Sequence, residues 1–333
     1  MPGTVKSFSE VVSDFNLSAQ TEFNQQYEML EPELQNFAFK YNAGNVSNTK
    51  FFMNMLFGDI KEWKGTQEYE KVDKIIKQQV EHVEYAVDGI EIPKRDFKRA
   101  QAANSITGLD MYTKMIGDRA LRAKDGPYEI MLEFLLAGAS NAKGTCFDNQ
   151  NLFDTTHSFS STAGNQSNLL TGTGTGTAAL STDLKAAISA FKSFHYSTNT
   201  GDDSVGKRRP LNKGNMKLVV VCDSSLYSAF NDLRTIENIV VDDAGGSQTN
   251  SLRNSFEVVS MPLDNPSDWF VIEVSEPSRK PFLISMEDEG ELHLPDENSP
   301  ALVNLQTLRY AFNGLSFGVA YGAWWKAVKC TNI

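Results

Sequence analysis

Asp154 and His157 are the two residues whose types and spacing could support chemistry. They stand three positions apart in the segment NLFDTTHSF, residues 151–159, and carboxylate and imidazole groups are both ligands for Zn²⁺ or Mn²⁺. A soluble metallohydrolase that uses this pair is therefore one interpretation. A closed metal site needs three or four ligands, however, and no carboxylate pattern flanks the other histidines, which are His82, His195 and His293.

The alternative interpretation of this segment is a rigid turn. The Asp154 carboxylate would cap the turn by accepting hydrogen bonds from nearby backbone, as Asp side chains commonly do. His157 would bond to a backbone carbonyl or to Asp154, while Phe153 and Phe159 would pack inward. Because only two candidate ligands are present, we favour the turn and expect no metal, no other cofactor and no catalytic residue.

Four other patterns could carry chemistry, and each is better explained without it. TGTGTGT (171–177) lacks the GK[ST] that ends a phosphate-binding loop. GKRRP (206–210) has acids nearby and is typical of solvated loop charge. MEDEGE (286–291) has no calcium-binding spacing and favours a solvated acidic turn, or a partner for basic residues of a neighbouring subunit. Trp324 and Trp325 are more typical of a core than of a ligand platform.

Composition excludes several classes of protein. The chain has 333 residues, 41% of them hydrophobic, so it can bury a core in one composite fold or in a few subdomains. Its net charge of -11 argues against a surface built mainly to hold phosphate backbones. Cys146, Cys222 and Cys330 form neither a disulfide framework nor a CxxC site, which indicates a reducing cytoplasm. The sequence shows no signal peptide and no apolar run of membrane-spanning length, so we expect neither secretion nor contact with a membrane.

The N-terminal part of the chain contains two elements that need a surface to lie on. Residues 1–50 suggest an arm with a short helix that Pro32 interrupts, and the arm is rich in aromatic residues for an isolated tail. Residues 58–95 suggest a projecting two-stranded hairpin, in which Val83–Ile92 alternates with the period of a strand. A lone hairpin is only marginally stable in water, so the hairpin too should lie on a partner.

The rest of the chain predicts one long helix followed by an α/β region. The helix spans Ser105–Ala139, breaks or kinks at Asp125-Gly126-Pro127 and stops at Gly138. A Ser/Thr/Gly-rich tract at 160–178 is typical of a mobile loop. Strands and helices then alternate, with strands at 217–221, 256–263, 268–275 and 280–286, helices at 182–194 and 224–233, and closing strands within 304–329.

Several segments resemble, in the family's order, the Mu-like phage major head (capsid) subunit. LFGDIKEWKGTQEY (56–69) is similar to its REW-G-R segment, and IMLEFLLAGAS (130–140) is similar to its Leu-rich helix end. The most specific segment is CFDNQNLFDTTHSF (146–159), which resembles the signature C-(Y/F)-D-G-x-x-F-F-D-T-D-H-P. The signature positions present are Cys146, Phe147, Asp148, Phe153, Asp154 and His157. Departures at Asn149, Thr156 and Ser158 indicate that these positions shape a turn.

The resemblance implies an α+β, HK97-like phage capsid fold. Its parts would be an N-terminal arm (1–50), an E-loop hairpin with its flanks (51–97), the spine helix of the P-domain (98–145), an A-domain (146–285) and returning strands (286–333) that complete the P-domain and the A-domain. The implied function is a non-enzymatic major capsid protein that self-assembles, through pentamers and hexamers, into the icosahedral shell around the double-stranded DNA of a tailed phage or prophage. Inter-subunit contacts are expected from Glu62, Trp63, Tyr69, Lys71 and Arg95.

The implied partners are further copies of the chain, a portal and a separate scaffolding protein, because only about 50 residues precede the hairpin. A decoration protein is a further candidate, and packaged DNA should make only weak, non-specific contact. The protein would be made in the host bacterial cytoplasm and end in the shell of the virion. An encapsulin-type compartment shell, which shares the fold, and the metallohydrolase are the alternative functions.

Overall fold

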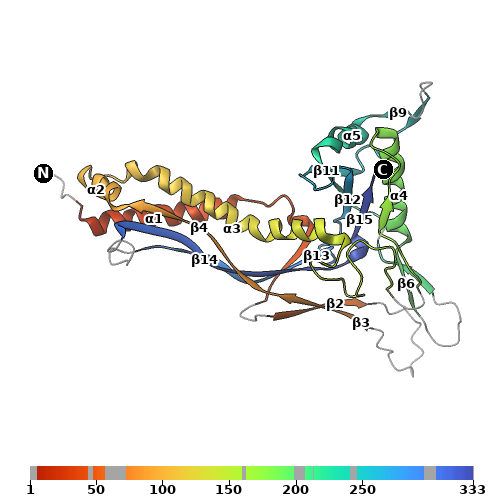
Figure 1. Ribbon diagram of the computed structural model, residues 1–333, viewed down its shortest axis with the longest axis horizontal. Coiled ribbons are helices and arrows are strands. Elements are labelled where there is room, and N and C mark those ends of the chain that lie inside the picture. The colour runs from red at the N-terminus through yellow and green to blue at the C-terminus, as the bar shows by residue number, and fades with distance from the viewer. Residues whose placement is uncertain are drawn as a thin grey trace, which may run out of the picture.

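A computed structural model describes residues 6–43, 48–56, 73–159, 163–198, 207–212, 214–240, 246–295 and 305–332. The described chain forms a long body and a second domain that stands at one end of it, which gives an L-shaped outline (Figure 1). The N-terminal helix begins at the far end of the body, and the last strand lies in the second domain (Figure 1).

A four-stranded sheet extends along the body. Its order is β1 (Ala38–Asn42), β13 (Phe282–His293), β14 (Thr307–Tyr321) and β4 (Val83–Pro93). β1 is parallel to β13, and the other two pairs are antiparallel. The strand predicted at 83–92 is confirmed, but it pairs with β14 inside this sheet and not within a projecting hairpin.

α1 (Phe8–Met29) packs on the body and is longer than the short helix predicted for the arm. It begins with a capping box, in which Ser7 Oγ accepts a hydrogen bond from Glu10 N at 3.2 Å and Glu10 Oε2 accepts one from Ser7 N at 2.6 Å. Its buried stripe meets the same chain, and the Phe15 and Tyr310 ring centroids lie 5.3 Å apart. The length prediction was wrong because contacts with the body stabilise the whole amphipathic stretch.

α3 (Asp110–Leu136) runs beside α1 along the body and passes through Pro127 without interruption (Figure 1). Of the break or kink predicted at 125–127, the break is therefore wrong. A proline inside a helix costs roughly 3 kcal/mol because it removes a backbone hydrogen bond, but Pro127 belongs to the buried stripe of α3, and packing offsets the cost. The predicted stop at Gly138 is confirmed, since a single 3-10 turn, η3 (Ala137–Ala139), ends the helix there.

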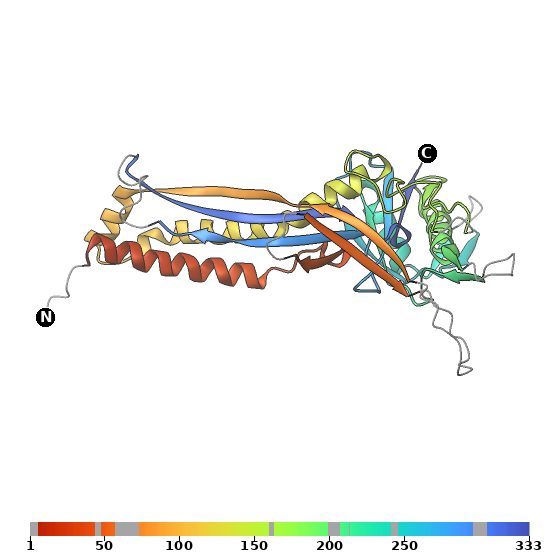
Figure 2. The ribbon, with the colours of Figure 1, turned by 90° about the horizontal axis from the view of Figure 1, so that it is seen from below.

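β2 (Asn48–Leu56) and β3 (Asp73–Glu81) pair in antiparallel fashion as a two-stranded ribbon that crosses the body (Figure 2). The end of β3 lies directly on β14. A Cβ atom on Gly318 would stand 2.2 Å from the Glu81 carbonyl oxygen and 2.6 Å from Val80 Cγ1, so only glycine fits at this crossing. The ribbon is thus held against the body at one end.

A five-stranded sheet forms the centre of the second domain. Its order is β11 (Phe256–Ser260), β8 (Leu218–Cys222), β12 (Asp268–Glu273), β15 (Ala327–Thr331) and β5 (Leu169–Thr171). β12 is antiparallel to both of its neighbours, and the two outer pairs are parallel. Every side chain of β8 and β12 is buried, which explains why the sequence predicts these strands correctly.

Two helices accompany this sheet, α4 (Thr177–Ser193) and α5 (Ser224–Thr235). The helix predicted at 224–233 is confirmed, whereas α4 begins five residues before the predicted start at Thr182. The mobile loop predicted at 160–178 is wrong for its described part, because β5 pairs with β15 and the Asp183 carboxylate accepts a hydrogen bond from Thr173 N at 2.8 Å. Backbone pairing and hydrogen bonds order this tract, together with Leu169 and Leu170, which pack against the core.

Two charged segments lie in strands where the sequence predicts a turn and a loop. Residues 286–291 belong to β13. The register of the pairing with β14 shifts between Met286 and Asp288, but the pairing continues beyond the shift and keeps this segment extended. Residues 207–210 form β7 (Lys207–Pro210), which pairs with β6 (His195–Thr198). In both cases the partner strand decides the conformation.

Short elements complete the described chain. They are η1 (Gln35–Phe37), α2 (Lys94–Ala102), η2 (Thr107–Leu109), β9 (Asn238–Val240), β10 (Ser247–Thr249) and η4 (Trp324–Lys326). η4 joins β14 directly to β15, so one stretch of chain belongs to both large sheets. Among the residues described above, no helix has both the length and the apolar character needed to cross a membrane.

Candidate functional site

The turn at residues 146–157 connects the end of α3 to the second domain. Cys146 N donates to Gln150 O at 2.8 Å, and Asn149 N donates to Cys146 O at 2.9 Å. Asn149 has a φ of 60°, in the left-handed region that Asn tolerates better than most residues. Phe153 N donates to Gly138 O at 2.8 Å, and a Cβ atom on Gly138 would stand only 2.9 Å from the Phe153 ring. The turn is therefore locked onto the helix end.

His157 is the centre of the turn and is fully buried. Its Nδ1 lies 2.8 Å from Asp148 Oδ2, and its Nε2 lies 3.1 Å from the Leu152 carbonyl oxygen. Each ring nitrogen therefore has an acceptor group within hydrogen-bond distance, the Asp148 carboxylate at Nδ1 and the Leu152 carbonyl at Nε2. The ring also stacks on Trp324, with centroids 4.3 Å apart and an interplanar angle of 5°.

Asp154 caps the turn, as predicted. Its Oδ1 accepts hydrogen bonds from Thr156 N at 2.9 Å and from Thr156 Oγ1 at 2.7 Å. Burial alone would raise the pKa of Asp154, but the hydrogen bonds from Thr156 outweigh burial and lower the pKa below its ordinary value. The Asp154 backbone N donates to Asn168 Oδ1 at 2.9 Å. Asp154 and His157 thus serve the same turn through different partners and do not share a ligand.

Asn168 ties the turn to the second domain, and no sequence pattern indicated this role. Its Nδ2 lies 2.7 Å from Leu152 O, 3.1 Å from Trp324 O and 3.1 Å from Ala327 O. These carbonyls belong to the turn, to η4 and to the start of β15. One buried amide therefore connects three segments that are far apart in the sequence.

Aromatic packing completes the junction around Trp325. Phe159 lies 5.5 Å from the Trp325 ring and Phe147 lies 6.0 Å from it, both in edge-on contact. Phe153 packs on Phe270 of β12 at 5.4 Å. Phe153 and Phe159 thus pack inward as predicted.

The site has little capacity for nucleophilic or metal chemistry. Burial, together with the nearby Asp148 and Asp154 carboxylates, raises the pKa of the Cys146 thiol well above its ordinary value, so the thiol stays protonated. Both ring nitrogens of His157 are engaged, and a metal could bind there only by breaking one of these contacts. Within the described ranges, no group of three or more His, Cys, Asp or Glu side chains is placed to hold a metal ion.

The predicted inter-subunit residues are only partly visible. Glu62, Trp63, Tyr69 and Lys71 lie outside the described residues. Arg95 lies on α2 at the far end of the body, where its side chain is 75% exposed and its Nε stands 3.7 Å from Asp96 Oδ1. This position leaves most of the guanidinium accessible to a partner.

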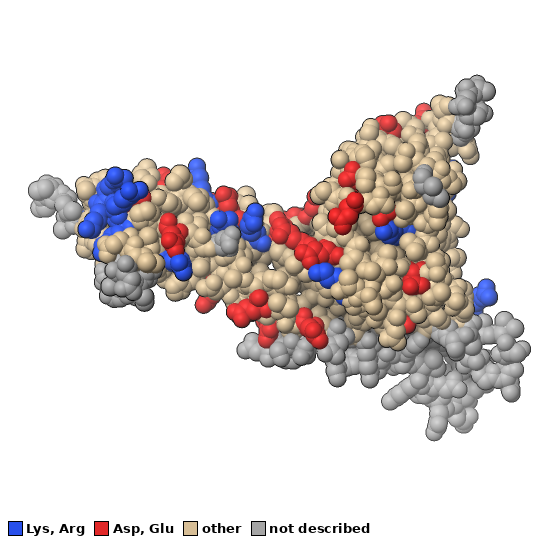
Figure 3. Space-filling view, in the orientation of Figure 1, with Lys and Arg blue, Asp and Glu red and all other residues tan. Residues whose placement is uncertain are grey.

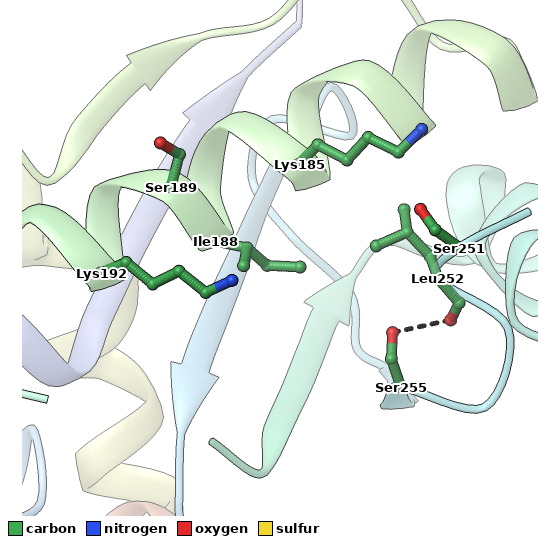
Figure 4. Close-up of a pocket in the computed structure, with 7 residues that line it drawn as sticks. All are labelled: Lys185, Ile188, Ser189, Lys192, Ser251, Leu252 and Ser255. Carbon is green, nitrogen blue, oxygen red and sulfur yellow. Dashed lines mark hydrogen bonds between the residues drawn. The ribbon is translucent and has the colours of Figure 1, made fainter. Parts of the chain in front are cut away.

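A hollow of about 410 Å³ lies between α4 and the segment after β10 (Figure 4). Lys185 and Lys192 reach along its α4 side, and Ile188 and Leu252 lie between the two elements (Figure 4). Ser255 Oγ donates to Leu252 O at 2.7 Å. The lining contains no carboxylate, imidazole or thiol, so it offers no acid–base or nucleophilic pair.

Residues 12–193, which are 182 of the 333 residues, match the family described as Mu-like prophage major head subunit gpT. The chain belongs to this family. The match includes the turn at 146–157 and confirms the resemblance found in the sequence. No curated protein matches the sequence.

Two solved structures have the same fold as this family member. The procapsid of bacteriophage JBD30 gives a TM-score of 0.52 at 15% identity, over 97% of this chain and 75% of the other chain. The capsid of cyanophage P-SCSP1u gives a TM-score of 0.53 at 10% identity, over 91% of this chain and 88% of the other chain. The predicted HK97-like phage capsid fold is confirmed. Family and fold together identify a tailed-phage major capsid protein, whose place is the shell of the virion.

Proposed function

We propose that copies of this major capsid protein assemble, through pentamers and hexamers, into a closed icosahedral shell around a double-stranded DNA genome. Membership of the major head subunit family carries this proposal. Subunits of one sequence that contact each other head to tail either close into a finite assembly or grow without limit. Modest contacts that repeat over many subunits then give a shell that is stable as a whole.

In this proposal the parts of the chain take distinct roles. Residues 1–50 are the N-terminal arm, 51–97 the E-loop hairpin with its flanks, 98–145 the spine of the P-domain and 146–285 the A-domain, and residues 286–333 return through both domains. Of the flanks, β4 lies in the body sheet. The β2–β3 ribbon supports the E-loop role, because a two-stranded ribbon is only marginally stable alone and this one is held at one end. We expect the ribbon to lie on a neighbouring subunit, with Glu62, Trp63, Tyr69 and Lys71 as contact residues.

The turn at 146–157 serves in this proposal as a structural joint and not as a catalytic centre. The engaged ring nitrogens of His157 and the buried thiol of Cys146 support this role. The signature residues Phe147, Asp148 and Phe153 would then be needed to hold the P-domain and the A-domain at one angle. We propose no enzymatic activity and no cofactor.

Further partners belong to the same proposal. A separate scaffolding protein and a portal would direct assembly in the bacterial cytoplasm, and a decoration protein could bind the finished shell. The net charge of -11 supports only weak, non-specific contact with packaged DNA, because few phosphates can be neutralised by such a chain.

Electron microscopy of the expressed protein tests the proposal. We expect closed shells, capsomers or tubes, and a protein that stays monomeric in all conditions would contradict it. A Gly318→Val variant should keep its circular dichroism spectrum but lose closed shells, because the new side chain displaces the ribbon from β14. Gly108→Val is the matched control, since a Cβ atom there meets nothing within 4 Å.

A further inference from the structure

The far end of the body carries a concentrated positive charge (Figure 3). We call this end the tip and define it as residues 94–111 together with Leu305 and Gln306. Its nine-residue helix α2 contains one acid and four basic residues, which are Lys94, Arg95, Lys98 and Arg99. This concentration stands out in a chain whose net charge is -11.

Most of this charge has no ion-pair partner among the described residues. Asp96 Oδ1 lies 3.7 Å from Arg95 Nε and 3.3 Å from Arg99 Nη1, while Asp96 Oδ2 accepts a hydrogen bond from Tyr112 OH at 2.9 Å. One carboxylate is therefore shared by two guanidinium groups. The side chains of Arg95 and Arg99 remain 75% and 77% exposed.

Exposed apolar side chains stand beside this charge. Met111 is 63% exposed in the first turn of α3, and Leu305 is 61% exposed next to Gln306, whose carbonyl accepts a hydrogen bond from Lys94 N at 2.8 Å. Arg and Met are enriched in protein interfaces, whereas a surface for phosphate backbones draws its affinity from charge. The composition of the tip therefore favours a protein partner.

A complementary surface lies elsewhere on the same chain. Asp288, Glu289 and Glu291 are exposed on β13, beyond the point where β1 ends opposite Met286. Lys40 Nζ lies 2.9 Å from Glu289 Oε1 and so neutralises one of these three acids. Lys40 does not serve the other two, Asp288 and Glu291. The acidic residues 288–291 of β13 thus form an exposed negative surface. They belong to the segment MEDEGE, for which the sequence offered a role as partner for basic residues of a neighbouring subunit.

The tip and the acidic residues of β13 are too far apart to meet within one subunit. Strand β14 runs past both surfaces. Its first residue, Thr307, pairs with β4 at the tip, and its residue Asn313 lies opposite Glu291 of β13. At roughly 3.3 Å per residue, the six steps along β14 from Thr307 to Asn313 span about 20 Å, and the nine steps from Thr307 to Ser316, which lies opposite Asp288, span about 30 Å. Only a second copy can bring the two surfaces together.

We propose that the tip of one subunit docks on residues 288–291 of β13 in a neighbouring subunit. The exposed Met111 and Leu305 would supply the apolar contact, and the charges would select the partner and its orientation. Because the two surfaces differ, the contact is head to tail and can propagate from subunit to subunit. The inference rests on the proposed function, since it supposes that copies of the chain assemble.

Cysteine trapping tests the contact. The three native cysteines are buried, so Lys98→Cys and Glu289→Cys place single accessible thiols on the two surfaces. Mixing the two variants under mild oxidation should give an inter-subunit disulfide at a several-fold higher yield than Lys98→Cys mixed with Ser189→Cys, an exposed control on α4. If shells form but the cysteines introduced at positions 98 and 289 do not become linked, this inference is overturned and the proposed function still stands. If the disulfide forms only in small oligomers that never close into shells, the docking contact is supported and the proposed shell is refuted. If neither the disulfide nor closed shells form, both the contact and the shell are refuted.

Charge exchange separates a docking contact from a folding defect. Lys98→Glu with Arg99→Glu should abolish assembly, and adding Asp288→Lys with Glu289→Lys should restore it. Assembly that is unchanged by the first pair, or not restored by the second, would count against the contact. If the first pair instead abolishes binding to a short DNA duplex and leaves self-association intact, the tip is a nucleic-acid surface and the inference is wrong.

Discussion

Replacing Asp148 by Asn should destabilise the protein by about 3 kcal/mol, because it leaves the buried His157 ring without its carboxylate. The His157 side chain is fully buried and the Asp148 side chain is 7% exposed, so water cannot replace the lost partner. Leaving a buried hydrogen-bonding group without its partner costs about 1–3 kcal/mol, and the loss of a carboxylate acceptor at a fully buried ring should fall at the upper end of this range. The melting temperature of unassembled subunits should fall by roughly 4 °C, since the unfolding entropy of a chain of 333 residues is about 0.7 kcal/mol/K.

A double-mutant cycle shows whether the pair itself carries this energy. His157→Gln alone should also destabilise the subunit, and the double variant should lose about 2 kcal/mol less than the sum of the two single losses. Denaturant unfolding at neutral pH measures all four proteins. Asp154→Asn is the control, since that carboxylate caps the turn near the surface and should cost about 1 kcal/mol or less. Additive losses, or equal losses for Asp148→Asn and Asp154→Asn, would refute the buried-pair account.

Two further predictions concern the same junction. Gly138→Ala should destabilise the subunit by about 1–3 kcal/mol, because the new methyl group would stand 2.9 Å from the Phe153 ring, whereas Gly108→Ala should change thermal unfolding little. Since the folded state lowers the pKa of Asp154 below its ordinary value of 3.8, ionised Asp154 stabilises the fold above that pH, and this contribution is lost as the pH falls below about 4. Asp154→Asn should therefore flatten the acid side of the curve of unfolding free energy against pH, and parallel curves for the two proteins would contradict this.

Local sequence patterns predicted the elements that local properties determine. β8 and β12 are buried on both faces, so their continuous apolar runs were sufficient, and the alternation of residues 83–92 identified β4. The failures share a different cause. The continuity of α3 through Pro127, the full length of α1 and the order of residues 163–178 all depend on contacts with distant segments, which no short window of sequence contains.

The candidate site divides in the same way. The Asp154 cap uses a residue two positions away, and the sequence predicted it. His157 instead bonds to Asp148, nine residues earlier, and stacks on Trp324 from the closing part of the chain. The signature resemblance placed Asp148 and His157 together without indicating that they are partners, and Asn168 carries no sequence pattern at all.

The direct passage from β14 through η4 into β15 has a consequence for the size of the particle. No flexible linker separates the two sheets along this stretch, so the bend in each subunit is set by the side chains packed at Trp324 and Trp325, both of which are fully buried. The curvature of a shell sums the bends within its subunits and the angles between them. The diameter of the head is then determined in part by a cluster of aromatic rings inside each subunit.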